Sequence, residues 1–270
     1  MPTIDPAQRL ALATAVAVEA GALALRYFRN LERLAVEHKG AQDLVSEADR
    51  AVERLIRARL SELCRGEPVL GEEGGADPGD LAAGCWVVDP IDGTWCFLNG
   101  IRSWCVSIAY ARRGRIEAGV VVDPCAGEVF QARSGGGARL DGRPIRVKDA
   151  ARLDEGSLSV GCSRRTSPEE IAPLIDALLR RDGLYHRHGS GALGLAWTAC
   201  GRLIGYVEPH MHPWDCLAGL LLVEEAGGWT NDFLAGDGLT EGNPVLAGGH
   251  RLKPHLLALT EHWGGRRVGS

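Results

Sequence analysis

The amino-acid sequence predicts a layered protein of the α+β / α/β class, and three observations support this prediction. The chain has 270 residues, enough for two domains at about 150 residues each. The first half contains two helical patterns followed by short apolar runs. The second half alternates short apolar runs with helical patterns, an order typical of helices layered on sheets. We therefore expect an N-terminal α+β domain over residues 1–150 and a C-terminal α/β domain over residues 151–270.

Two helices are predicted at the start of the chain. From Asp5 to about Leu34, apolar residues recur at steps of three and four, the period of an amphipathic helix. The segment Val36 to Gly40 is expected to break this helix. A second apolar stripe follows Ser46-Glu47-Ala48-Asp49, which fits a capping box with the aspartate in third place after the serine.

The chain beyond Gly66 predicts an antiparallel sheet and then an alternating segment. Short apolar runs bounded by glycine or charge are typical of strands and cover 68–71, 85–88, 104–110, 116–122 and 129–132. Gly135-Gly136-Gly137 and Asp141-Gly142 mark hairpin turns. Further strands are expected at 157–161, 184–188, 203–207, near 229 and at 244–247, with helices at 168–181, 192–200, 214–226 and 252–263. The short linker from Asp149 to Gly156 is a plausible domain boundary and predicts closely packed domains.

Composition limits the partners that we expect. The 30 basic and 35 acidic side chains give a net charge of −5, a poor balance for binding nucleic acid. No run of about 18 apolar residues and no signal peptide is evident, so we expect no membrane partner and a cytoplasmic location. The eight cysteines include no C-x-x-C pair and are expected to be reduced thiols.

Four acidic clusters lie at the edges of apolar elements. They are Asp43 with Asp49, Glu72-Glu73, Asp89 with Asp92, and Asp215. Carboxylates buried beside apolar elements are costly unless positive charge compensates them. Hard cations such as Mg²⁺ take oxygen ligands, and no His/Cys cluster with zinc spacing competes for this role. These clusters therefore suggest a magnesium site.

The most informative segment is Asp89-Pro90-Ile91-Asp92-Gly93-Thr94. Proline restricts the residue before it to extended geometry, so a turn here could aim both aspartates into one space. The next residues open a short helix-like segment, 94–98, whose free N–H groups make an anion site. This combination suits metal-assisted phosphoryl transfer. Taken singly, these residues also fit a turn, Glu72-Glu73 fits a solvated pair, and Asp215 fits a helix N-terminal charge.

These motifs resemble the inositol monophosphatase family. The segment 89–94 matches its D-P-[IL]-D-G-T signature, and Trp214-Asp215-Cys216-Leu217-Ala218-Gly219, with the later Glu225-Ala226-Gly227-Gly228, matches its second signature. Gly71-Glu72-Glu73 matches G-E-E, and residues 43–49 resemble D-L-V-T-x-x-D with Ser46 in place of threonine. The resemblance covers about residues 5–265 and implies a layered α-β-α-β-α sandwich, as in inositol monophosphatases and fructose-1,6-bisphosphatases.

The resemblance implies a role for each site residue. Glu72, Asp89 and the carbonyl of Ile91 would hold one Mg²⁺, and Asp89, Asp92 and Asp215 a second, with a weaker third ion also near Glu72. Thr94 and Asp49 would orient and deprotonate the attacking water, with Glu72 also assigned to catalysis. The N–H groups of Gly93 and Thr94 would hold the phosphate. The implied reaction is in-line attack of a metal-activated water on a phosphate monoester, without a phosphoenzyme.

The implied substrate contacts are Asp92, Gly191, Ala192 and Glu208. If Glu208 accepts hydrogen bonds from two neighbouring hydroxyls, the substrate is a polyol such as an inositol monophosphate; an ordinary strand-end carboxylate is the alternative. Trp95 and the stretch from Pro209 to Pro213 depart from the inositol-specific pattern. Histidinol phosphate is therefore the second candidate, followed by fructose 1,6-bisphosphate and adenosine 3′,5′-bisphosphate. Lys39 is either a basic site residue or a solvated lysine, and His210 and His212 are either a pocket wall or plain packing.

The resemblance also bears on partners and regulation. Relatives are commonly homodimers and lithium-sensitive, so both properties are expected here. Some bacterial relatives act by binding transcription machinery, which gives a regulatory binding protein as the alternative from another functional class. That alternative predicts an eroded ligand set or a basic docking surface, whereas this chain is acidic and its predicted ligand set is complete.

Overall fold

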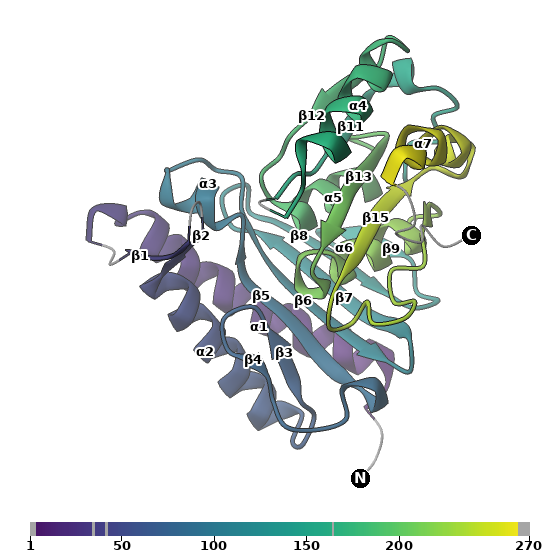
Figure 1. The fold of residues 1–270 in the computed structure, drawn as a ribbon. Helices are drawn as coiled ribbons and strands as arrows, with labels where there is room; N and C mark the ends of the chain where they lie inside the picture. The colour runs from purple at the N-terminus through teal and green to yellow at the C-terminus, as the bar shows by residue number, and fades with distance from the viewer. Residues whose placement is uncertain (1–3, 34–35, 41–42, 164, 264–270) are drawn as a thin grey trace.

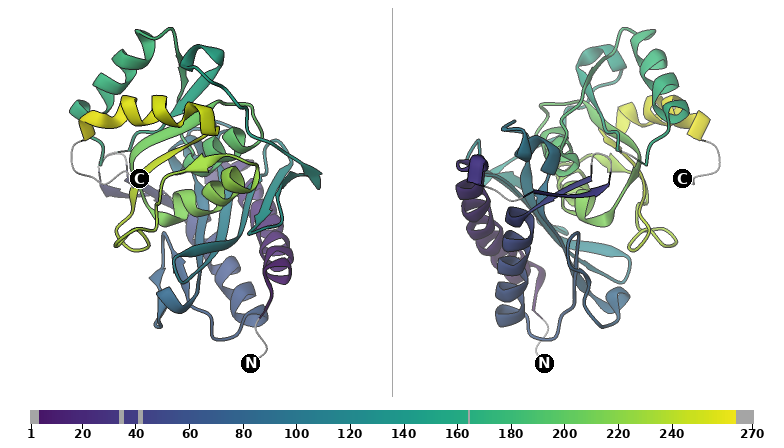
Figure 2. Two further views of the ribbon diagram at one scale, coloured as in Figure 1. Left: turned by 90° about the vertical axis from the view of Figure 1, so that its right-hand side faces the viewer. Right: turned by 60° about the vertical axis from the view of Figure 1, so that its left-hand side comes forward.

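The protein is a five-layered α-β-α-β-α sandwich, described here from a computed structural model (Figure 1). The structure describes residues 4–33, 36–40, 43–163 and 165–263, and the side chains of these residues outside 33–46. Helices α1 (Pro6–Phe28) and α2 (Glu47–Leu63) cover one face of an eight-stranded sheet, and α5 (Gly191–Ala199) and α6 (Pro213–Glu225) cover the other. A five-stranded sheet follows, with α4 (Pro168–Leu179) and α7 (Lys253–Thr260) on its far side (Figure 2). The layered fold that the sequence predicts is confirmed.

The eight-stranded sheet provides half of the candidate site. Its order is β10-β9-β8-β7-β6-β5-β3-β4, and its neighbouring strands are antiparallel except for the parallel pair β3 and β5. The strands are β3 (Val69–Gly71), β4 (Gly75–Ala76), β5 (Cys85–Asp92), β6 (Cys105–Arg112), β7 (Arg115–Asp123), β8 (Glu128–Arg133), β9 (Ala138–Leu140) and β10 (Arg143–Pro144). The pairing of β5 with β6 shifts register between Asp89 and Asp92. Such an irregularity re-aims side chains, and it falls on the segment that carries the predicted metal ligands.

The five-stranded sheet has the order β12-β11-β13-β15-β14. Its strands are β11 (Ser157–Val160), β12 (Leu184–His186), β13 (Gly205–Met211), β14 (Trp229–Thr230) and β15 (Asn243–Gly248). Strand β11 is parallel to β12 and β13, whereas β15 is antiparallel to β13 and β14. Short 3-10 turns lie at Leu31–Arg33, Leu81–Ala83, Leu153–Glu155, His250–Leu252 and Glu261–Trp263.

Helices α5 and α6 join the two sheets. Apolar side chains of both helices share one buried cluster with β5 to β8, including Leu195, Leu217 and Val121. The division into domains 1–150 and 151–270 therefore stays a proposal. In this division, the second domain contributes the middle helical layer, which packs against the first sheet. The close fit is clearest at Gly119, where an added Cβ would lie 2.9 Å from the Cα atom of Ala218.

The first helix differs from its prediction in two respects. Helix α1 ends at Phe28, and a hairpin, β1 (Val36–Gly40) with β2 (Asp43–Ser46), occupies the segment expected only to break the helix. By length and composition alone, α1 is also long and apolar enough to cross a membrane, a test that a helix packed in a protein core passes as well, and 33% of its apolar window is buried in the protein. Its Arg9 is 2% exposed and pairs with Glu67 at 2.6 Å, which anchors the helix to the sheet side.

We expect Gly119→Ala to destabilise the protein because the added methyl group would push β7 away from α6. Overpacking of this kind costs about 1–3 kcal/mol. The measurement is the free energy of unfolding in urea. Arg115→Ala, at the exposed start of the same strand, is the control and should change it by less than about 0.5 kcal/mol. Equal stability of the Gly119→Ala variant and the parent would contradict the close contact between these layers.

Candidate active site and metal centre

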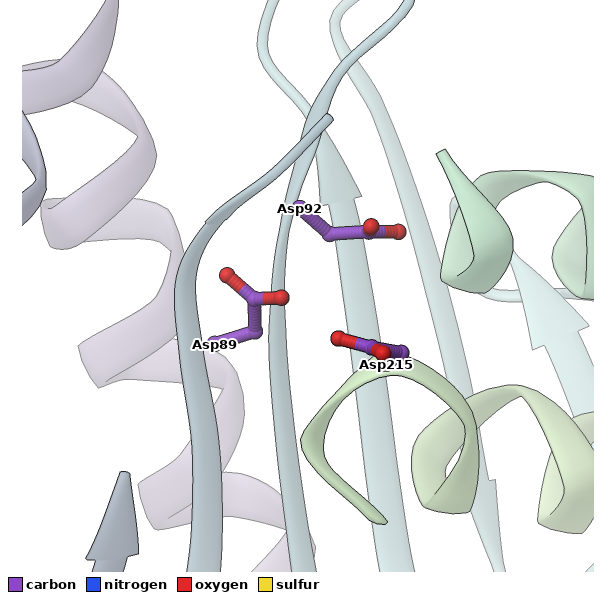
Figure 3. Close-up of side chains that lie close together, drawn as sticks. All are labelled: Asp89, Asp92 and Asp215. Carbon is purple, nitrogen blue, oxygen red and sulfur yellow. The ribbon is translucent and has the colours of Figure 1, made fainter. Parts of the chain in front are cut away.

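Three aspartates from distant parts of the chain converge at the junction of the two halves. Asp89 and Asp92 lie at the end of β5, and Asp215 lies in the first turn of α6. One oxygen from each lies within 4.8 Å of the other two. Figure 3 shows the three carboxylates facing a common space. Asp89 and Asp92 are buried, and Asp215 is partly exposed, so the group is open to a small solute from one side.

Local hydrogen bonds fix each aspartate. The Ile91 N–H donates to Asp89 Oδ1 at 2.9 Å, a local turn that the preceding proline favours. Asp92 Oδ2 accepts from Ser190 Oγ at 2.6 Å and from the Ala192 N–H at 2.7 Å. Asp215 Oδ2 accepts from the His212 N–H at 3.2 Å, which closes the first turn of α6. These hydrogen bonds set the direction of each carboxylate.

The electrostatic state of this cluster is unfavourable. Burial raises the pKa of Asp89 well above its ordinary value, and the neighbouring Glu72 and Asp92 raise it further. Burial also raises the pKa of Glu72, reinforced by Asp215 and Glu73. Burial raises the pKa of Asp215 to about 8, and Asp92 adds to this effect. Several carboxylates that resist ionising together indicate a site for positive charge.

Glu72 lies beside the three aspartates but outside their tightest group. It follows β3, which is parallel to β5, so both strands end at the same edge of the sheet. Among the neighbouring charges, the charge of Glu72 raises the pKa of Asp89 most. Its oxygens are not among those that lie within 4.8 Å of one another. Glu72 therefore stays a predicted ligand at the margin of the cluster.

The predicted water-activating pair is in contact. Thr94 Oγ1 donates to Asp49 Oδ1 at 3.2 Å, and it also lies 3.1 Å from the Ile91 carbonyl oxygen. Asp49 is fully buried on α2, and Thr94 opens α3 (Thr94–Leu98). Gly93 has φ of 95°, and an added Cβ would lie 2.8 Å from the Ser103 carbonyl oxygen. Glycine is thus required at the turn that presents the predicted phosphate-binding N–H groups.

A cleft of about 140 Å³ extends from the aspartates into the second half. Glu208 lines it from β13, is 7% exposed, and accepts a hydrogen bond from Tyr206 Oη at 2.6 Å. Burial raises the pKa of Glu208 to about 7. Gly191 also lines the cleft, whereas Ala192 is fully buried and its N–H donates to Asp92. Ala192 would therefore affect the substrate only indirectly, through its hydrogen bond to Asp92.

The remaining predicted residues lie elsewhere. The side chains of Lys39 and Asp43 fall outside the described ones. His212 stacks on Trp214 with 4.6 Å between ring centroids, and neither His212 nor His210 lines the cleft. His212 therefore packs on an aromatic ring, whereas His210 accepts a hydrogen bond at 3.2 Å from Arg165 Nε, and Arg165 lines the cleft.

Sequence reasoning missed several residues of the cleft. Ser190 could have been found as the residue before a helical pattern, because serine is a preferred N-cap and here caps α5. Tyr206 stands two residues before Glu208 on a strand, so both point to one face. Arg165 and Arg187 also line the cleft and have no motif of their own.

The donor set suits a hard divalent cation. The ligand atoms available are carboxylate and carbonyl oxygens, and no histidine or cysteine belongs to the acidic group found among the described residues. Carboxylates that converge from the edge of a sheet and the first turn of a helix define a layered α/β protein with a site that could hold a metal ion.

Comparisons with known proteins identify the class more closely. The model of the inositol monophosphatase family matches residues 5–263. An inositol-1-monophosphatase from Mesorhizobium japonicum is 38% identical, over 89% of this chain and 91% of its own. The Nus factor SuhB of Xylella fastidiosa is 40% identical, over 81% and 79%. The crystal structure of the extragenic suppressor protein SuhB from Bartonella henselae superposes with a TM-score of 0.86 and 31% identity, over 95% and 98%. The chain belongs to the inositol monophosphatase family.

We expect the metal-free protein to lose stability as the pH rises. Asp215 has a raised pKa in the fold, so the folded state holds a proton that the unfolded state releases. The loss runs from about pH 3.8, the ordinary pKa of an aspartate, to about pH 8, at up to about 1.4 kcal/mol per pH unit. Urea unfolding in chelator at pH values between about 5.5 and 8.5 measures it.

Magnesium should remove this pH dependence, and Asp215→Asn should reduce it in the metal-free protein. Stability that rises with pH in chelator, or that is indifferent to magnesium, would contradict a cluster of mutually repelling carboxylates.

Proposed function

We propose that the protein is a Mg²⁺-dependent phosphatase that hydrolyses a small phosphate monoester by in-line attack of an activated water. The observation that carries this proposal is the convergence of Asp89, Asp92 and Asp215 next to the bonded pair Thr94 and Asp49. Family membership supports the same reaction class. Two to three magnesium ions are proposed for each site.

Each residue is assigned one task. Glu72, Asp89, Asp92, Asp215 and the Ile91 carbonyl oxygen would hold the ions. Bound magnesium would neutralise the phosphate oxygens and lower the pKa of the attacking water. Thr94 would orient this water, and Asp49, which the threonine hydroxyl contacts at 3.2 Å, would receive its proton. The N–H groups of Gly93 and Thr94 would hold a phosphate oxygen.

The first candidate substrate is an inositol monophosphate. Glu208, buried at the cleft wall, would accept hydrogen bonds from neighbouring hydroxyls, and Asp92 and Gly191 would flank the ring. The relative from Mesorhizobium japonicum carries the name inositol-1-monophosphatase. Histidinol phosphate and fructose 1,6-bisphosphate are the alternatives for the same residues.

A regulatory binding role is the second candidate function. It is favoured by the relatives named Nus factor SuhB, of which one is 40% identical to this chain. Because of these names, the expectation of no nucleic-acid partner rests on the acidic charge alone and stays a prediction, as does the cytoplasmic location. A binding protein would need no turnover, so catalysis separates the two candidates.

We expect magnesium-dependent phosphate release from at least one ester among myo-inositol 1-phosphate, fructose 1,6-bisphosphate, L-histidinol phosphate and adenosine 3′,5′-bisphosphate. Asp89→Asn should reduce kcat/KM by at least about 100-fold, because a ligand shared by two ions contributes several kcal/mol to the transition state. Lithium should inhibit the reaction.

Asp123→Asn is the matched control. Asp123 is also a buried aspartate at a strand end of the same sheet, and its carboxylate accepts N–H groups of the following turn. Its variant should keep phosphate release, whatever it costs in stability. Near-parent activity of Asp89→Asn would place the metal centre elsewhere, and absence of release from every ester would favour the regulatory candidate.

We also propose a homodimer. Large apolar side chains are exposed on α3 and the loop after it, at Trp95 and Ile101, and on the edge strand β12, at Leu184 and Tyr185. The two regions adjoin, because Cys96 Sγ lies 3.9 Å from the His188 carbonyl oxygen. Sedimentation velocity should therefore give the mass of two chains, and Leu184→Glu combined with Tyr185→Glu should give one. A monomeric parent at micromolar concentration would refute the dimer.

A further inference from the structure

The cleft is lined by side chains of both charges. Its acidic groups are Asp92, Asp215 and Glu208. The loop between β11 and α4 contributes Arg165, and the chain after β12 contributes Arg187. In the proposed site the metal ions and the N–H groups of Gly93 and Thr94 would bind the reacting phosphate, so an ester with one charged group would leave Arg187 without a partner in the substrate.

Arg187 is held over the cleft by the backbone. Its Nη2 atom donates to the Cys162 carbonyl oxygen at 3.1 Å, which connects the chain after β12 to the loop opposite. Among the described residues, no carboxylate lies within 4.0 Å of this guanidinium. The guanidinium has five N–H donors in a fixed fork, so most remain available for an anion in the cleft.

Arg165 adds a second positive charge to the cleft. Its Nε atom lies 3.2 Å from His210 Nδ1, and its Nη2 atom reaches Asp215 Oδ2 only at 3.9 Å. A long contact between partly exposed groups is weak and gives way to a closer anion. The charges of both arginines extend into the cleft, because each lowers the pKa of Glu208 against the stronger effect of burial.

Chain geometry limits the distance between Arg187 and the acidic group. Ser190, whose hydroxyl donates to Asp92, is three residues after Arg187. Three residues span at most about 11 Å of extended chain. The backbone of Arg187 therefore lies no farther from Ser190 than about the length of one small sugar or polyol.

Resting on the proposed phosphatase function, we propose that the preferred substrate carries a second anionic group, a phosphate or a carboxylate, bound by Arg187 with Arg165 beside it. Glu208 would then contact the hydroxyls between the two anionic groups of the substrate. These contacts favour a doubly anionic ester over myo-inositol 1-phosphate and so change the order of the candidate substrates given above. It disfavours L-histidinol phosphate, whose ammonium group would face two arginines.

The test compares kcat/KM for four esters with magnesium. Fructose 1,6-bisphosphate supplies a second phosphate, 3-phosphoglycerate a carboxylate, myo-inositol 1-phosphate no second charge, and L-histidinol phosphate a cation. We expect one of the two doubly anionic esters to be preferred, and the preferred ester identifies the anion. In Arg187→Gln, kcat/KM for this ester divided by kcat/KM for myo-inositol 1-phosphate should fall about 10- to 100-fold, chiefly through KM. Arg187→Lys should restore part of this ratio.

Arg181→Gln is the matched control, since Arg181 is an exposed arginine after α4 that bonds only a backbone carbonyl among the described residues. It should leave the ratio unchanged. A parent that prefers the uncharged or cationic ester, or an equal loss on all four esters in Arg187→Gln, would overturn the second-anion proposal while leaving the phosphatase intact. A fall in sedimenting mass of Arg187→Gln would likewise overturn it, because the residue would then act through assembly. Absence of release from all four esters by the parent would instead refute the phosphatase.

Discussion

The two hydrogen bonds that Asp92 accepts determine how the halves of the molecule meet at the site. Asp92 ends β5 of the eight-stranded sheet, and its donors, Ser190 Oγ and the Ala192 N–H, belong to the start of α5. A buried carboxylate needs such donors, because its desolvation is costly without them. The N-terminus of α5 in turn has free N–H groups that a carboxylate satisfies. Through this contact, the first sheet is placed against α5 and α6, and Asp215 is brought within reach of Asp89.

The meeting of the two halves also brings several carboxylates close enough to repel one another. Burial and neighbouring charges raise the pKa of Asp89, Glu72 and Asp215 together, so the metal-free fold holds carboxylates that its local chemistry disfavours. The three apolar clusters of the sandwich offset this cost, and the largest includes α5, α6 and the inner face of the first sheet. The apolar layers thus stabilise the fold, whereas the site between them contains buried carboxylates that destabilise it.

The sequence predicts elements well where a repeating pattern extends over many residues. The stripe of α2, the runs that became β5 to β8 and the alternation of the second half all follow from periodicity. The hairpin of β1 and β2 was missed because Val36–Gly40 is short and mostly polar, so pairing rather than pattern makes it a strand. Motif resemblance predicted Asp89, Asp92 and Asp215 as ligands, and the fold brings their carboxylates together. The resemblance did not reveal Ser190 or Tyr206, since their roles depend on which strand and helix ends meet in space.

Arg187 shows the limit of sequence reasoning most clearly. In the sequence, an arginine between two histidines is a solvated charge, the usual state of an arginine. In the fold, its Nη2 atom donates to the Cys162 carbonyl oxygen at a cleft that Asp92, Asp215 and Glu208 also line, and no carboxylate among the described residues lies within 4.0 Å of it. Under the proposed function, the carboxylates and this arginine would contact different parts of a ligand. The carboxylates would hold a cation that binds phosphate, a group shared by every candidate ester. Discrimination between esters is left to residues outside the family signatures, which is why motif resemblance predicts the reaction better than the substrate.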